Sequence, residues 1–170
     1  MILTGPFIER EVQAGRIVIE PFRPEAVNPN SYNYRLGEHL KSFDTERDVF
    51  VDLQIPESGY VLEPGRMYLG HTAEVIGSST YAMSLIGRSS MGRLGLFLQV
   101  SADLGHTTSC HRWTLELVPV LRIRLYPGMV IGQVSFWRNA GDVCPSPAYY
   151  ARFNRPYESR IGRPRDPHRN

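Results

Sequence analysis

Residues 87–96 read Gly-Arg-Ser-Ser-Met-Gly-Arg-Leu-Gly-Leu. The guanidinium groups of Arg88 and Arg93 stand five residues apart, with the paired hydroxyls of Ser89 and Ser90 between them. Guanidinium donors match phosphate oxygens, and serines at the start of a helical turn leave backbone N–H groups that point at an anion. The run therefore predicts a phosphate-binding turn, with a helix cap beside two solvated arginines as the structural alternative.

Short apolar runs on both sides of this turn predict strands. Turn residues such as Glu63-Pro64-Gly65 and Tyr126-Pro127-Gly128 separate these runs. The strands are expected at residues 17–19, 31–35, 49–53, 67–71, 82–86, 97–102, 113–118, 122–125 and 129–137. One short helix is expected at residues 7–14, ended by Gly15. Many short strands with a single short helix predict an all-β barrel or sandwich.

Size and composition favour one ordinary globular domain. The chain has 170 residues, of which 42% are hydrophobic, and its net charge of +2 is too small to indicate nucleic-acid binding. Cys110 and Cys144 do not make a disulfide framework. No signal peptide is visible, and no window approaches the ~18 apolar residues that a membrane span needs. We therefore expect a cytoplasmic protein.

A lone carboxylate stands in the expected strand at residues 113–118. Strand alternation places Leu115 and Leu117 on one face and Glu116 on the other. On a solvated face this glutamate is an ordinary surface residue. In a cleft, desolvation would raise its pKa and make it a usable general base near neutral pH.

Six segments resemble the dCTP deaminase family, within the wider dUTPase-like superfamily, in order and spacing. They are residues 15–21, 31–37, 62–65, 87–96, 114–117 (Thr-Leu-Glu-Leu) and 126–133 (Tyr-Pro-Gly-Met-Val-Ile-Gly-Gln). The resemblance implies a distorted β-barrel or jelly roll of the dUTPase-like type, assembled as a homotrimer with active sites between subunits. It also implies hydrolytic removal of the amino group from C4 of a deoxycytidine triphosphate, with no nucleic acid or membrane as partner.

The same resemblance implies roles for four residues in the chemistry. Glu116 would activate the attacking water and return the proton to the ring nitrogen and the departing ammonia. Ser89 would help to bind the water and the amino group, and Arg93 would lie beside the base and the carboxylate. The backbone carbonyl of Ala102 would orient the water. No protein-bound zinc is implied, and the His-x-Glu and Pro-Cys-x-x-Cys signature of zinc base deaminases is absent from the sequence.

Phosphate binding and closure of the site are also implied by the resemblance. Arg88 and Ser90 would hold the phosphates, which would bring Mg²⁺ with them. Tyr149 and Tyr157 match tail residues of the family, and Arg160 stands where the family has glutamine. We expect a dUTPase-like domain at residues 1–162, whose lid at about 149–162 folds over the nucleotide. Residues 163–170 form a basic C-terminal tail.

One loop departs from the family pattern. Residues 103–111 read Asp-Leu-Gly-His-Thr-Thr-Ser-Cys-His, so that His106 replaces the usual aspartate and Thr107-Thr108 replaces a Pro-Gly turn. In the superfamily this loop shapes the sugar and base pocket, which makes Asp103 and His106 candidates for that pocket. The missing aspartate weakens the prediction of diphosphatase activity and leaves the sugar or base specificity open. With Arg160 in place of the family's glutamine, a modified cytosine nucleotide or a monophosphate stays an alternative substrate.

Three alternatives therefore stay open beside the deaminase. One is a nucleotide diphosphatase or a bifunctional enzyme, and another is a non-catalytic nucleotide-binding relative with a rebuilt loop at residues 103–111. A third is a zinc site at His106, Cys110 and His111. Their spacing is not a usual zinc pattern and a fourth ligand is missing, so a polar loop is favoured there.

Overall fold

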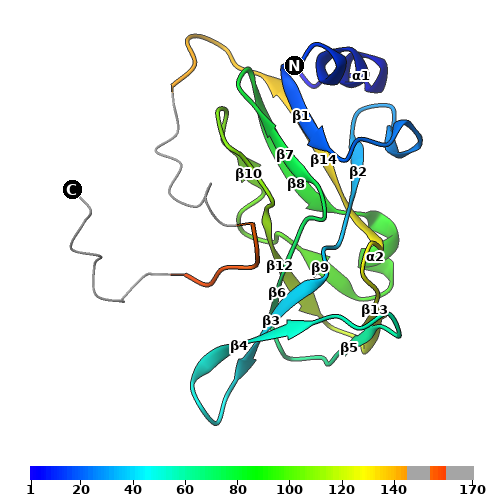
Figure 1. Cartoon of the computed structure of the whole chain (residues 1–170), viewed down its shortest axis with the longest axis vertical. Coiled ribbons are helices and arrows are strands. Elements are labelled where there is room, and N and C mark those ends of the chain that lie inside the picture. The colour runs from blue at the N-terminus through cyan, green and yellow to red at the C-terminus, as the bar shows by residue number, and fades with distance from the viewer. Residues whose placement is uncertain (145–153, 160–170) are drawn as a thin grey trace, which may run out of the picture.

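Short antiparallel strands make up most of the computed structural model, which describes residues 1–144 and 154–159 (Figure 1). Two α-helices are found in the described residues, α1 (Gly5–Gln13) and α2 (Ser89–Arg93). The strands are β1 (Ile17–Glu20), β2 (Tyr32–Arg35), β3 (His39–Asp44), β4 (Val49–Gln54), β5 (Tyr60–Leu62), β6 (Tyr68–His71), β7 (Val75–Ser78), β8 (Tyr81–Gly87), β9 (Leu96–Leu98), β10 (Leu104–Gly105), β11 (Cys110–His111), β12 (Thr114–Pro119), β13 (Ile123–Leu125) and β14 (Val130–Arg138).

The strands of the described residues form four sheets around one hydrophobic core. Their orders are β1-β7-β11, β10-β8-β14-β2, β4-β3-β6-β12-β9 and β13-β5. Figure 1 shows the first two sheets at one end of the molecule and the five-stranded sheet at the other, with the hairpin β3–β4 projecting outward. The expected all-β fold is confirmed.

Alternating side chains explain why these segments pair as strands. In β12, Leu115 and Leu117 are fully buried while Glu116 between them is half-buried. In β2, Tyr32 and Tyr34 are likewise fully buried in the core. A face that hides every second residue is the pattern of a strand with one side on the core. The predicted faces of residues 113–118 are therefore confirmed.

Two glycines of the quoted motifs make room for rings. A Cβ atom at Gly132 would lie 2.0 Å from Cζ of Tyr34, whose hydroxyl donates a 3.0 Å hydrogen bond to the carbonyl of Ile86. A Cβ atom at Gly37 would lie 2.0 Å from Cε1 of His71. Backbone and ring approach each other too closely at both places for any larger residue.

A buried carboxylate ties α1 to the sheet. Arg16 donates two hydrogen bonds to Glu11, at 2.5 and 2.6 Å, and the Tyr81 hydroxyl at the start of β8 donates a third at 2.8 Å. The hydrogen bonds of Arg16 are the main cause that lowers the pKa of Glu11 to about 2. The carboxylate thus stays ionised and joins α1 to the turn at Arg16 and to β8.

The structure corrects two details of the sequence prediction. The strand expected at residues 97–102 ends at Leu98, because Gln99 takes a positive φ of 51° that breaks the extended backbone. Five strands were missed. Strands β3 and β7 do not stand out as short apolar runs between turn signals, and β5, β10 and β11 have only two or three residues each. No helix in the described residues is long and apolar enough to cross a membrane.

Candidate active site

Residues 87–96 include the turn from β8 into α2, and α2 itself. Arg88 caps α2 with extended backbone, and its N–H donates to the carbonyl of Ile131 at 3.1 Å. Ser89, Ser90 and Arg93 are exposed. Among residues 1–144 and 154–159, the side chains of these three residues and of Arg88 make no hydrogen bond or ion pair. The predicted helical turn is confirmed, and it presents guanidinium and hydroxyl donors to solvent.

Glu116 lies on β12, which pairs with β6 on one side and with β9 on the other. Its backbone N–H donates to Oε1 of Gln99 at 2.8 Å, and its carbonyl accepts the N–H of Gln99 at 3.3 Å. Ser101 Oγ donates to Glu116 Oε2 at 3.4 Å. The carboxylate is half-buried, so it remains open to a ligand on one side.

Gln99 connects Glu116 with a second residue of the predicted site. Its Oε1 accepts a hydrogen bond from the backbone N–H of Glu116, and its Nε2 donates one to the carbonyl of Ala102 at 3.1 Å. A carbonyl oxygen has two lone pairs, so that of Ala102 can still accept a hydrogen bond from a water. Sequence reasoning missed Gln99 and Ser101, whose signal was only that polar residues interrupt an apolar run.

One chain keeps the two halves of the predicted site apart. Leu96 pairs with Pro119, whereas Glu116 lies beside Gln99, three residues further along the chain. Three strand steps span about 10 Å, and α2 precedes Leu96. In the described part of the chain, no hydrogen bond or ion pair joins Glu116 to the α2 turn. The donors of α2 and the carboxylate therefore occupy different ends of this strand pair.

The divergent loop at residues 103–111 is anchored through polar contacts. Ser84 Oγ donates to the carboxylate of Asp103 at 2.6 Å, which fixes the start of the loop. Thr107 is buried and accepts a hydrogen bond from Asn139 at 3.0 Å. Thr108 has a φ of 74°, a region that glycine adopts easily and a β-branched residue rarely does. His106 stays exposed between these anchors.

The trio considered for zinc is arranged differently from a metal site. Cys110 is exposed, whereas His111 is buried and packs on Trp113 with ring centroids 4.2 Å apart and the rings tilted by 30°. The Nδ1 atom of His111 is 2.8 Å from the carbonyl of Arg112, and burial lowers the pKa of this histidine. The described residues contain no group of three or more His, Cys, Asp or Glu side chains placed to hold a metal ion.

Part of the predicted lid lies against the sheet that carries Glu116. The N–H of Tyr157 donates to Thr114 Oγ1 at 3.3 Å, and Glu158 pairs with Lys41 at 3.3 Å. Lys41 and Glu116 both pair with Leu69 in register, so their side chains share one face of the sheet. Segment 154–159 therefore lies on that face (Figure 1).

Tyr149, Arg160 and the basic tail at 163–170 lie outside the described residues.

Residues 2–139 match a protein-family model described as dCTP deaminase-like. The chain belongs to the dCTP deaminase-like family. This family member is 44% identical over 142 residues to the dCTP deaminase, dUMP-forming, of Cytophaga hutchinsonii, covering 80% of this chain and 82% of that protein. It is 40% identical over 151 residues to the dCTP deaminase of Rhodopirellula baltica, covering 84% of this chain and 74% of the relative. The resemblance drawn from the motifs is confirmed.

A solved structure is similar to this dCTP deaminase-like chain in fold. The crystal structure of 2'-deoxycytidine 5'-triphosphate deaminase from Agrobacterium tumefaciens superposes with a TM-score of 0.67 at 21% identity. The match covers 79% of this chain but only 46% of that one, so the chain spans less than half the length of the Agrobacterium protein. It supports the dUTPase-like β fold.

Proposed function

We propose that this protein removes the amino group from C4 of dCTP by hydrolysis and releases dUTP and ammonia. The observation that carries the proposal is the environment of Glu116, a half-buried carboxylate whose strand is clamped by Gln99 and whose Oε2 lies 3.4 Å from Ser101 Oγ. Membership of the dCTP deaminase-like family and relatives named dCTP deaminase support the substrate.

The chemistry needs a water, one base and a path for protons. Glu116 takes a proton from the water as its oxygen bonds to C4, and returns that proton to the ring nitrogen N3. The tetrahedral carbon then loses its amino group, which leaves as ammonia after a second proton transfer from the water-derived hydroxyl through Glu116. The Ala102 carbonyl accepts a hydrogen bond from the water, while Ser89 and Arg93 hold the water and the base in place.

The remaining predicted residues bind the rest of the nucleotide. Arg88 and Ser90 hold the phosphates, and Mg²⁺ arrives on the triphosphate oxygens. Asp103 and His106 border the sugar and the base. The two cysteines are free thiols, which fits a reducing cytoplasm.

The tail completes the site in this proposal. Tyr149, Tyr157 and Arg160 belong to a lid at about 149–162 within a domain that spans residues 1–162, followed by the basic tail at 163–170. Its support is the position of segment 154–159 on the face of the sheet that carries Glu116. A lid there excludes bulk water from the reacting atoms.

A homotrimer would unite the two halves of the site, because α2 of one copy can meet Glu116 of the next. Exposed apolar side chains near α2 and β9 support such packing. They are Ile86, Leu94, Phe97, Val100, Leu104, Val120 and Leu121. Burial of this surface between copies would place the α2 donors beside the neighbouring carboxylate.

A second candidate function is a bifunctional reaction that also hydrolyses the triphosphate to dUMP and pyrophosphate. The relatives from Cytophaga hutchinsonii and Clostridium acetobutylicum, at 44% and 42% identity, are both named dUMP-forming. His106 argues against this bifunctional reaction, because it occupies the position where the family resemblance places a water-activating aspartate.

Product analysis tests both candidates. The chain is incubated with cytidine and deoxycytidine mono-, di- and triphosphates in Mg²⁺, and ammonia, pyrophosphate and the nucleotide product are each quantified. Ammonia with intact dUTP supports the deaminase, and ammonia with stoichiometric pyrophosphate and dUMP supports the bifunctional reaction. Nucleotide-induced thermal stabilisation without any product would overturn both and indicate a binding protein.

A further inference from the structure

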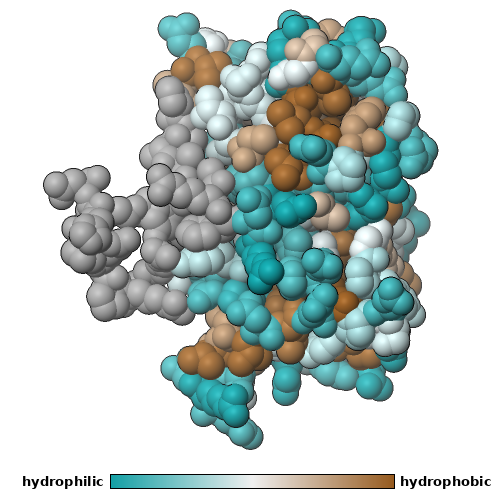
Figure 2. Space-filling model, viewed as in Figure 1, coloured by the Kyte–Doolittle hydropathy of each residue, from teal (hydrophilic) through white to brown (hydrophobic). Residues whose placement is uncertain are grey.

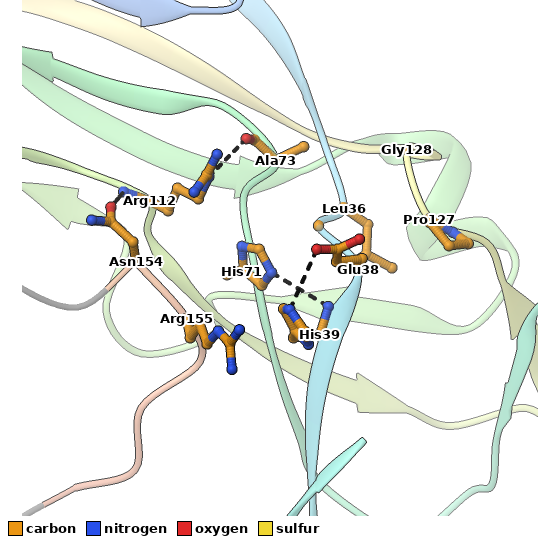
Figure 3. Close-up of a pocket in the computed structure, with 11 residues that line it drawn as sticks. Leu36, Glu38, His39, His71, Ala73, Arg112, Pro127, Gly128, Asn154 and Arg155 are labelled. Atoms are coloured by element: carbon orange, nitrogen blue, oxygen red, sulfur yellow. Dashed lines mark hydrogen bonds and ion pairs between the residues drawn. The ribbon is translucent and has the colours of Figure 1, made fainter. Parts of the chain in front are cut away.

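A pocket of about 370 Å³ opens beside the Glu116 row of the five-stranded sheet (Figure 3). Its floor is formed by His39 on β3 and His71 on β6, and its rim by Arg112, Asn154 and Arg155, together with backbone of residues 36–38, 73 and 127–128. His71 pairs with Thr114, which lies two residues before Glu116 on the same face of β12. The pocket is thus about 7 Å along the strands from the row of Glu116 and distinct from it.

The two floor histidines are held in fixed positions. The ring of His71 has Nδ1 2.9 Å from the carbonyl of Thr72, and its Nε2 accepts the N–H of His39 at 3.4 Å. The two rings stack with centroids 5.9 Å apart. Both ring nitrogens of His71 are therefore engaged within the protein. The Nε2 atom of His39 lies 3.4 Å from the carboxylate of Glu38.

Positive charge and open donors gather on the rim. Arg112 uses its Nε on the carbonyl of Ala73 at 3.1 Å, which orients the guanidinium and leaves its terminal nitrogens without a partner in the described residues. Arg155 is exposed and extends from the tail segment toward His39 in Figure 3, with no partner among the described residues. Asn154 accepts the N–H of Arg112 at 3.2 Å through Oδ1, so its amide N–H groups remain free to donate.

These donors belong to two guanidinium groups and one amide, supplied by two segments far apart in the sequence. The single carboxylate of the lining, Glu38, has a mostly exposed side chain and lies beside His39. A carboxylate ligand needs one guanidinium fork, whereas a phosphate dianion offers three oxygens that match forks from two directions. The net positive lining and the spread of its donors therefore favour a phosphate.

We propose that this pocket binds a phosphate group, between Arg112 and Arg155 and above His39. Free phosphate, pyrophosphate and a nucleotide phosphate share this chemistry. The site does not use the α2 donors, so it exists whether or not the chain deaminates dCTP. Because Arg155 and Asn154 come from segment 154–159, an occupied pocket would also hold that segment on the sheet.

Histidine NMR tests the proposal at the pocket itself. The full chain carries Arg88→Ala and Arg93→Ala, which remove the α2 donors, and its histidines are labelled with ¹³C at Cε1. Sodium phosphate, pyrophosphate and dUMP are added separately at constant ionic strength and neutral pH. Saturable shifts of the His39 and His71 signals are expected, without comparable shifts of His106 or His111. A His39→Gln variant assigns the pocket signals.

Two arginine variants decide the outcome. Arg155→Ala is expected to raise the Kd at least about tenfold, as loss of one charge-assisted contact does. Arg66→Ala, which removes an exposed arginine outside the pocket, leaves the Kd unchanged. The ligand with the lowest Kd identifies the source of the phosphate. The proposal is overturned if no ligand gives saturable shifts at millimolar concentration, or if Arg155→Ala binds as tightly as its parent. Absence of deaminase activity leaves this titration unaffected, so the two proposals fail separately.

Discussion

The side chain of Gln99 determines how Glu116 is placed. One amide group accepts from the backbone of Glu116 at 2.8 Å and donates to the carbonyl of Ala102 at 3.1 Å. The positive φ of Gln99 turns the chain so that both contacts form at once. In the proposed mechanism, this residue fixes the distance between the base and the carbonyl that orients the water.

Replacement of Gln99 by leucine keeps the side-chain volume and removes both hydrogen bonds. We expect kcat for ammonia release to fall about 10- to 100-fold, since misplaced groups lose that much catalysis, with little change in KM. Gln54→Leu, at an exposed position of β4, serves as the matched control and should retain parental kcat. A Gln99→Leu enzyme that keeps full kcat would show that the amide does not position the base.

The buried ring of His71 makes the stability of the protein depend on pH. Burial is the main cause that lowers its pKa from about 6.5 to about 4. The unfolded chain therefore binds more protons than the folded chain between these values. The contribution of His71 to stability is complete above pH 6.5 and is lost as the pH falls toward 4.

This linkage predicts a pH-dependent free energy of unfolding. Urea denaturation from pH 7 to pH 4 should show stability declining in the wild type and declining less steeply in His71→Gln, which has no titrating ring. Parallel pH profiles for the two proteins would mean that His71 titrates alike in the folded and unfolded states.

Strands β2 and β14 fit together because a glycine of one strand faces a tyrosine ring of the other. Gly132 of β14 pairs with Tyr34 of β2, and the ring occupies the volume that a side chain at Gly132 would need. Tyr34 is fully buried and anchored to the carbonyl of Ile86 on β8. The motif glycine therefore joins three neighbouring strands of one sheet.

Two alanine substitutions measure this packing. Gly132→Ala should destabilise the fold by roughly 3 kcal/mol or more, because overpacking displaces a buried ring. Gly92→Ala in α2, where an added Cβ meets nothing closer than 4.0 Å, should change stability by less than about 1 kcal/mol. Equal effects of the two substitutions on the urea midpoint would contradict the fit between Gly132 and Tyr34.

The sequence could predict the strands whose apolar runs lie between turn signals, and it could predict the faces of β12. It missed β3 and β7, because a strand can pair through its backbone without a clear apolar run, and it missed β5, β10 and β11, which are only two or three residues long. Among site residues, the α2 turn and Glu116 were visible as motifs. Gln99 was not, since its importance depends on a positive φ and on two contacts across a turn. The pocket beside His39 depends on strand register and was also beyond sequence reasoning.

The proposed homotrimer needs apolar surface on which its copies can pack. Figure 2 shows hydrophobic side chains in separate groups on one face, including one around the hairpin β3–β4, where Phe43 and Val49 are exposed. A further set of exposed apolar residues lies near α2 and β9, among them Phe97 with 46% of its surface exposed. Because one chain separates α2 from Glu116, the proposed activity requires that this second set be buried between copies.

Phe97→Glu tests that requirement. A charge at a buried subunit contact is costly, whereas the same change on an exposed strand position of a monomer costs little. Light scattering should give about three chain masses for the wild type and one chain mass of 19.3 kDa for the variant, with loss of ammonia release. A monomeric variant with full activity would show that one chain contains the complete site.

The proposed mechanism depends on the carboxylate of Glu116, which activates the water that attacks dCTP. Steady-state ammonia release from dCTP by Glu116→Gln measures this most directly, because glutamine keeps the shape and removes the base. We expect kcat to fall at least about 10²-fold, the lower range for general-base catalysis, with folding and nucleotide binding retained. Turnover by Glu116→Gln at the parental rate would contradict it.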